Sequence, residues 1–406
     1  MKSIIILGDG MSDHPVAALN GRTPLMVAKK PAIDHIARQG RSGLLHTIPD
    51  GMPMGSEVAN LSVLGYDPTE CFQGRGVLEA ASMGVLLDAN DVGMRCNLIC
   101  VDDDGRIRNH SAGHISTDEA HVLIEDLQKA LGGQGPEPVA FYPGVSYRHL
   151  LVFKGFGHPQ VRCAPPHDHV GELERDLLPR ALHPEAESTA RRLRDLMTAA
   201  RDILASHPIN LARVAAGKDP ANRIWPWSLG RRPSMSTFQE MYGISGAVIS
   251  AVDLIQGIGV LGGMEKIEVP GATGLFDTNY EGKAAAALEA IQRHDFVYVH
   301  VEAADEAGHE RNLELKIRCI EDLDQRLVRL ILAGIEKMKA PVILSVLPDH
   351  PTPVETGLHN NDPVPVAIWH PGKTPDAVAG YDEEQVKQGA LGTMQKDAFF
   401  RRAIGR

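Results

Sequence analysis

Short apolar runs recur along the chain and predict buried strands. The first run is Ser3–Leu7, which is rich in β-branched residues and ends at Gly8-Asp9-Gly10. Further strands are expected at 247–251, 296–301 and 342–347, and helices with apolar residues at helical spacing are expected at 284–292 and 313–332. Strands that alternate with helices are typical of a parallel sheet covered on both faces. We therefore predict an α/β fold with a doubly wound, mostly parallel sheet.

The middle of the chain has a different pattern. Strands are expected at 95–101 and 145–153 and helices at 118–131 and 185–204, separated by loops rich in Gly, Pro and His. This pattern predicts an inserted α+β domain at 85–225, and a core domain built from 1–84 and 226–406. The alternative is that this region is the middle of one continuous domain.

A helix is expected to begin at Ser56. Val58, Leu61 and Leu64 recur at helical spacing until Gly65 and Pro68 end the run. The backbone N–H groups and the dipole at a helix N-terminus favour an anion, so the Ser56 hydroxyl could carry a phosphoryl group. The alternative is that Ser56 only caps the helix.

Acidic and histidine residues follow three of the predicted strands. The ends of parallel strands line one crevice, so residues far apart in sequence can meet there. We expect two metal sites: one formed by Asp9, Asp349, His350 and the Ser56 oxygen, the other by Asp305, His309 and His359. Carboxylates mixed with imidazoles suit Mn²⁺ or Zn²⁺, and Mg²⁺ where carboxylates dominate. Taken singly, each histidine could instead be a structural residue.

Composition restricts the possible functions. The chain has 406 residues, of which 43% are apolar, as expected for a globular protein with more than one core. A net charge of −11 argues against nucleic-acid binding, and the five cysteines form no C-x-x-C pair. The N-terminus has no recognisable leader and no apolar run reaches the length of a membrane span, so we expect a soluble, cytoplasmic protein.

These motifs resemble the alkaline phosphatase superfamily, and within it the cofactor-independent phosphoglycerate mutases of the archaeal-type group. The matching segments are Gly8-Asp9-Gly10-Met11, Gly55-Ser56-Glu57, Leu61–Pro68, Asp305-x-x-x-His309, Pro348-Asp349-His350 and His359. The resemblance implies an alkaline-phosphatase-like core, two divalent ions, and Ser56 as a nucleophile that becomes phosphoserine. It implies interconversion of 3- and 2-phosphoglycerate without 2,3-bisphosphoglycerate. As our own hypothesis, the insert acts as a lid that holds the intermediate and excludes water.

Two features depart from the usual mutases and leave the substrate open. Asn60 occupies a position where we expect a histidine, and 224–233 resembles a bacterial branch proposed to act as homoserine kinases. A homoserine-kinase-like phosphotransferase is therefore an alternative, and a non-catalytic metal- or phosphometabolite-binding protein is a third. The candidate substrate-binding residues are Arg148, His149, Arg231 and Lys283. His114, His167 and Asp168 of the insert could equally be structural.

Overall fold

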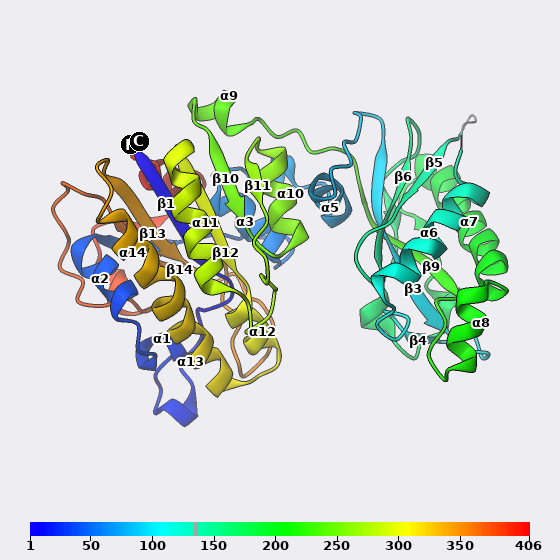
Figure 1. Cartoon of the computed structure of the whole chain (residues 1–406), viewed down its shortest axis with the longest axis horizontal. Coiled ribbons are helices and arrows are strands. Elements are labelled where there is room, and N and C mark those ends of the chain that lie inside the picture. Colours follow the sequence, from blue (N-terminus) through cyan, green and yellow to red (C-terminus); the bar gives the residue numbers. More distant parts are fainter. Residues whose placement is uncertain (134–136) are drawn as a thin grey trace. The chain divides into compact units, whose positions relative to one another are not determined.

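The computed structural model describes residues 1–133 and 137–406, which form two compact units (Figure 1). The first unit consists of Met1–Phe72 and Ser234–Arg406, and the second of Gln73–Pro233. Both ends of the chain therefore build one unit, and the second unit is inserted between them.

The limits of the insert differ from those expected at 84/85 and 225/226. Helix α5 (Arg75–Ser82), which the sequence placed in the core, packs on β3 (Val92–Val101) of the second unit. Strand β9 (Arg223–Gly230) pairs antiparallel with β3 along most of its length. The second unit therefore extends to Pro233, because β9 is one of its own strands.

An eight-stranded, mainly parallel sheet forms the centre of the first unit and confirms the predicted α/β class. The strands are, in spatial order, β11 (Glu265–Ile267), β10 (Gly246–Ile249), β12 (Phe296–Val301), β1 (Lys2–Gly8), β13 (Val342–Leu347), β14 (Val364–Trp369), β2 (Arg41–Leu45) and β15 (Gly392–Met394). Only β14 runs antiparallel to its neighbours. β14 was not expected, because Pro365 interrupts its apolar run.

Helices cover both faces of this sheet. On one face, α2 (Pro31–Gln39) and α11 (Tyr280–Arg293) pack on the strands and share a core with alternate residues of β1 and β12. On the other face, α10 (Asp253–Leu261) packs on β10, and α15 (Ala398–Ala403) on β1 and β13. Residues of every central strand are therefore buried on both sides, which explains their continuous apolar sequence.

The helix expected at 313–332 consists of three pieces. Helix α13 (Leu313–Asp322) continues into a π-helical segment, Leu323–Val328, and then into α14 (Arg329–Ile335). The apolar spacing predicted the location of this helix but not the change in its hydrogen-bonding pattern.

An antiparallel sheet forms the second unit, together with α5 and three further α-helices in the part of the chain that the structure describes. The sheet has the order β4 (Ile107–Asn109), β3, β6 (Arg148–Phe153) and β5 (Val139–Tyr142), with β9 also paired to β3. The further helices are α6 (Thr117–Leu131), α7 (Glu187–Ala205) and α8 (Pro208–Ala215). Residues of β3, α6 and α7 pack into one apolar core.

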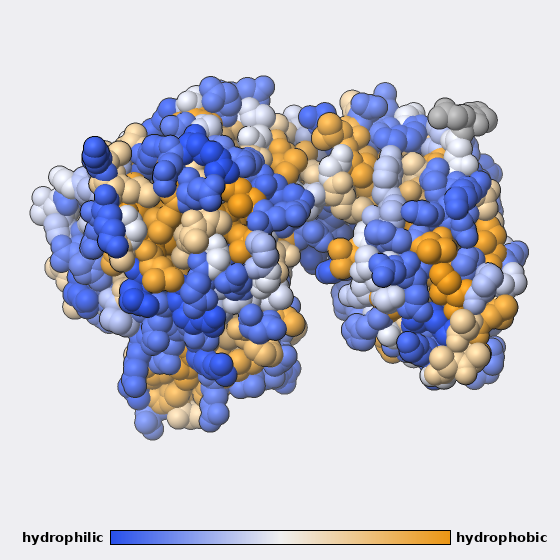
Figure 2. All heavy atoms as spheres, viewed as in Figure 1, coloured by the Kyte–Doolittle hydropathy of each residue, from blue (hydrophilic) through white to orange (hydrophobic). Residues whose placement is uncertain are grey.

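The visible surface of both units is mainly hydrophilic, with apolar residues in separate small groups (Figure 2). Within residues 1–133 and 137–406, no helix combines the length and the apolar character that crossing a bilayer requires.

Candidate active site

Three strand ends bring acidic residues to one edge of the large sheet. Strand β1 lies between β12 and β13 and is parallel to both. Asp9 follows β1, Asp349 and His350 follow β13, and Asp305 lies in α12 (Ala303–His309), just after β12. The structure thus brings together residues that the sequence predicted would meet there.

The first cluster is formed by Asp305, His309 and His359. The Nε2 atoms of His309 and His359 lie 3.1 and 3.2 Å from the two carboxylate oxygens of Asp305, and 2.9 Å from each other. Each Nδ1–H donates to a backbone carbonyl, His309 to Gly357 at 2.9 Å and His359 to Met54 at 3.0 Å. In the neutral rings both Nε2 lone pairs therefore point at one place, as in histidines that bind metal.

The second cluster is formed by Asp9, Asp305 and His350. His350 Nε2 lies 3.6 Å from Asp9 Oδ1 and 3.4 Å from Asp349 Oδ2. Asp9 Oδ1 is buried and, among the residues that the structure describes, has no hydrogen-bond partner. Asp305 takes part in both clusters, whereas the sequence assigned it to one. A buried, unpartnered carboxylate oxygen beside an imidazole fits a divalent cation.

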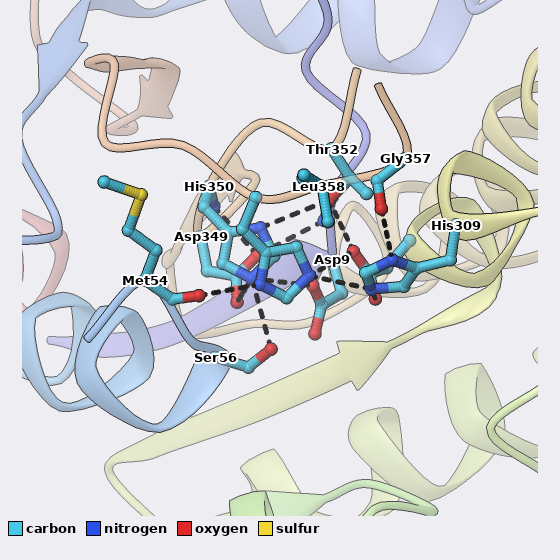
Figure 3. A network of polar contacts seen from close by, with 12 residues as sticks. Asp9, Met54, Ser56, His309, Asp349, His350, Thr352, Gly357 and Leu358 are labelled. Atoms are coloured by element: carbon cyan, nitrogen blue, oxygen red, sulfur yellow. Dashed lines mark hydrogen bonds and ion pairs between the residues drawn. The ribbon is translucent and has the colours of Figure 1, made fainter. Parts of the chain in front are cut away.

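Ser56 is the first residue of α3 (Ser56–Val63), and Gly55 occupies the N-cap position. The expected alternative, a capping serine, is therefore wrong. The Ser56 hydroxyl instead lies 3.1 Å from His350 Nε2 (Figure 3). The nucleophile candidate thus stands beside the second cluster and at a helix N-terminus, where backbone N–H groups lack intrahelical acceptors.

The electrostatics of the site also fit cations. Burial raises the pKa of Asp9 well above its usual range, and the nearby carboxylates Asp349, Asp305 and Glu302 raise it further. Burial would raise the pKa of Asp305 as well, but hydrogen bonds with His309 and His359 hold it well below its usual range. The hydrogen bond with Asp305 raises the pKa of His309 to about 9. Divalent cations among these groups would favour their ionised carboxylates and neutral imidazoles.

Sequence reasoning missed His300, a fully buried residue in β12. Its Nε2 lies 2.9 Å from Asp9 Oδ2, and its Nδ1 lies 3.2 Å from the Ser250 hydroxyl. His300 and Glu302 form a third group of possible metal ligands with Asp9. The available signal was a histidine inside the otherwise apolar run Phe296–Val301.

Two of the candidate substrate-binding residues, which the sequence assigned to the core domain, have internal partners. Lys283 is buried on α11 and donates to the carbonyl of His300 at 3.0 Å, and burial lowers its pKa to about 8. Arg231 belongs to the second unit and donates to the carbonyl of Gly157 at 2.9 Å. Both side chains are therefore held by backbone oxygens of their own unit.

The two candidates in the insert differ in exposure. His149 is buried and accepts a hydrogen bond from the Gly144 amide at 3.0 Å, and burial lowers its pKa to about 3. Arg148 is exposed, with its guanidinium 5.9 Å from the Tyr147 ring centre. The substrate-binding role of these four candidates stays a prediction.

Comparison with known proteins identifies the family. A family model described as 2,3-bisphosphoglycerate-independent phosphoglycerate mutase matches residues 37–210. A Methanosarcina acetivorans protein of that name is 51% identical over 396 residues, covering 97% of each chain. A Geobacter sulfurreducens protein named as a probable member is 50% identical, covering 96% of each chain. The chain belongs to this family. The resemblance inferred from the motifs is confirmed.

Solved structures agree with this assignment. A Pyrococcus horikoshii protein is 28% identical with a TM-score of 0.82, covering 99% of this chain and 97% of its own. The cofactor-independent phosphoglycerate mutase of Thermoplasma acidophilum is 28% identical with a TM-score of 0.69, covering 98% of each chain.

Membership of the phosphoglycerate mutase family has three direct consequences. The chain is an enzyme, an isomerase, so the alternative of a non-catalytic binding protein is wrong. Its substrate is a small phosphorylated metabolite. It uses divalent metal ions, for which the two clusters offer ligands.

Proposed function

We propose that the enzyme interconverts 3-phosphoglycerate and 2-phosphoglycerate through a phosphoserine at Ser56. The observation that carries the proposal is the position of the Ser56 hydroxyl, 3.1 Å from His350 and at the start of α3. Family membership supplies the reaction, and this position supports Ser56 as its nucleophile.

We propose that the enzyme binds two divalent ions, which are Mn²⁺ or Zn²⁺, with Mg²⁺ as the alternative. One ligand set is Asp9, Asp349, His350 and the Ser56 oxygen, which shares Asp9 and His350 with the second cluster. The other set is the first cluster, Asp305, His309 and His359. The fixed Nδ1 contacts of His309 and His359 support the second set, because they turn both Nε2 atoms toward Asp305. Bound ions would lower the pKa of the serine hydroxyl and neutralise the phosphoryl oxygens.

The reaction consists of two balanced transfers. In the first, Ser56 Oγ loses its proton and forms a bond to phosphorus while the bond from phosphorus to the glycerate oxygen breaks. The freed glycerate oxygen takes up one proton, so the transfer is neutral overall. In the second, the other glycerate hydroxyl loses its proton and takes the phosphoryl group back from Ser56, which is reprotonated. The N-terminal amides of α3 favour the anionic group throughout both steps.

Replacement of Ser56 by Ala tests this role. Ser56→Ala should abolish both the interconversion and the phosphoprotein formed with labelled phosphoglycerate, while divalent-ion binding persists. Ser62→Ala is the matched control, because Ser62 lies on the same helix but lines a separate hollow with Tyr66 and Asp67. Interconversion by Ser56→Ala at the wild-type rate would contradict the phosphoserine scheme.

The acceptor is tested separately. We favour phosphoglycerate over homoserine because relatives about half identical to the chain over nearly its full length are named as mutases. Incubation with 3-phosphoglycerate should yield 2-phosphoglycerate, whereas homoserine with nucleotide donors should yield no phosphohomoserine. Activity only in the second assay would overturn the proposed substrate.

A further inference from the structure

The side chain of Asn60 connects the helix of the nucleophile to a predicted metal ligand. Asn60 is fully buried in α3, one turn after Ser56. Its amide nitrogen donates to the backbone carbonyl of Ser56 at 2.9 Å and to Asp349 Oδ2 at 2.9 Å. Both hydrogens of the amide group are therefore used.

Tyr298 adds a third hydrogen bond to this amide. The Tyr298 hydroxyl, fully buried on β12, donates to Asn60 Oδ1 at 2.5 Å. The Ser56 carbonyl and the Asp349 carboxylate can only accept, so a flipped Asn60 would lose both of these hydrogen bonds. The chain of donors runs in one direction, from Tyr298 through Asn60 to the carboxylate of Asp349.

These contacts restrict how Asp349 can bind a cation. Its Oδ1 accepts from the Gly10 amide at 3.3 Å and from the His350 amide at 2.9 Å, and its Oδ2 accepts from Asn60. A carboxylate offers about four acceptor positions, so three are occupied and the fourth is on Oδ2. This oxygen lies 3.4 Å from His350 Nε2, on the side of the second cluster.

We propose that Asn60, held in place by Tyr298, is a positioning residue that presents a single oxygen of Asp349 to a divalent ion. The same side chain ties that ligand to the first turn of α3, and so sets the position of Asp349 relative to Ser56. Asn60 acts through Asp349 and Ser56 and need not touch substrate. The inference rests on the proposed two-ion site.

Two variants test the connection by Mn²⁺ titration calorimetry. Asn60→Leu has a similar volume and removes all three hydrogen bonds, and should weaken Mn²⁺ binding by about tenfold or more, the loss typical of residues that orient metal ligands. Tyr298→Phe removes only the hydroxyl and should weaken binding less, because Asn60 keeps its other contacts. Both variants should lower kcat with little change in KM for phosphoglycerate, since the substrate contacts are intact.

The double variant distinguishes a connected path from two separate effects. If Tyr298 acts through Asn60, adding Tyr298→Phe to Asn60→Leu should weaken Mn²⁺ binding no further. Tyr280→Phe is the matched control, since Tyr280 is fully buried and its hydroxyl has no hydrogen-bond partner among the described residues. It should leave Mn²⁺ affinity unchanged.

Other outcomes would overturn the inference in recognisable ways. If Asn60 were only structural, Asn60→Leu would lower the unfolding temperature of the metal-free protein while its Mn²⁺ affinity stays within twofold of wild type. If Asn60→Leu does not fold, unchanged affinity in Tyr298→Phe overturns the role of Tyr298 and with it the inference. If the wild type bound no divalent ion at all, the proposed two-ion site would fail first.

Discussion

The Nε2 atoms of His309 and His359 face each other at 2.9 Å, and each also contacts the carboxylate of Asp305. Two imidazole lone pairs repel at this distance unless a proton or a metal ion lies between the rings. The same two nitrogens are therefore sites for which protons and cations compete.

This competition predicts a pH-dependent metal affinity. The hydrogen bond with Asp305 raises the pKa of His309 from 6.5 to about 9, so a bound ion must displace a proton below that pH. Mn²⁺ affinity measured by calorimetry should rise from pH 6.5 to about 9. The stability of the metal-free protein should instead fall over the same pH range. Its stabilisation by protonated His309 is fully present below pH 6.5 and is lost as the pH rises through about 9. Chemical denaturation in the presence of a chelator measures this loss of stability. His309→Ala should reduce the pH dependence of both the Mn²⁺ affinity and the stability of the metal-free protein.

A methyl group at position 10 should disrupt the site. Gly10 has a φ of +60°, and a Cβ there would lie 2.5 Å from Asp305 Oδ1 and 2.6 Å from the Thr352 hydroxyl. Gly10→Ala should therefore displace Asp305, weaken Mn²⁺ binding at least about tenfold, and destabilise the fold by roughly 1–3 kcal/mol in chemical denaturation. Gly21→Ala is the control, because Gly21 has a φ of +75° and open space around its Cβ position. A Gly10→Ala protein with wild-type Mn²⁺ affinity would show that Asp305 need not hold this position.

A buried ion pair supports the loops that carry the ligands. Lys316 Nζ contacts Asp13 Oδ2 at 2.8 Å and donates to the carbonyls of Ser12 and Thr352 at 3.0 and 2.8 Å. Lys316→Met should leave Asp13 buried without its cation and lower the free energy of unfolding by roughly 3–5 kcal/mol. The double variant Lys316→Met, Asp13→Leu should recover part of that loss, as measured in urea. No recovery would mean that the loops depend on the carbonyl contacts of Lys316 and not on its charge.

The sequence was sufficient to predict the strand ends but not what surrounds them. Asp9, Asp305 and Asp349 each follow an apolar run, and parallel strands must bring such positions to one edge. The sequence around three other residues of the site predicts only a buried strand or helix. These residues are His300, Tyr298 and Asn60. Their partners depend on which strands become neighbours, and periodicity does not specify that order.

The strands that were missed have a physical explanation too. β9 and β14 each contain a proline, Pro226 and Pro365, which breaks the pattern expected of a strand. β15 has only three residues, too few to show any alternation. These short or interrupted segments are held by their neighbours in the sheet, so their conformation depends on tertiary pairing more than on local preference.

The position of β1 between β12 and β13 affects how the protein can be made. On the ribosome, Lys2–Gly8 is synthesised long before its first partner, which begins only at Phe296. At 5–20 residues per second the strand waits about 15–60 s for that partner. The insert, whose strands all lie within one continuous segment, can fold during that interval. A newly made apolar strand without neighbours is prone to aggregate, so the nascent chain should depend on chaperones that shield Lys2–Gly8 until Phe296–Val301 has been made.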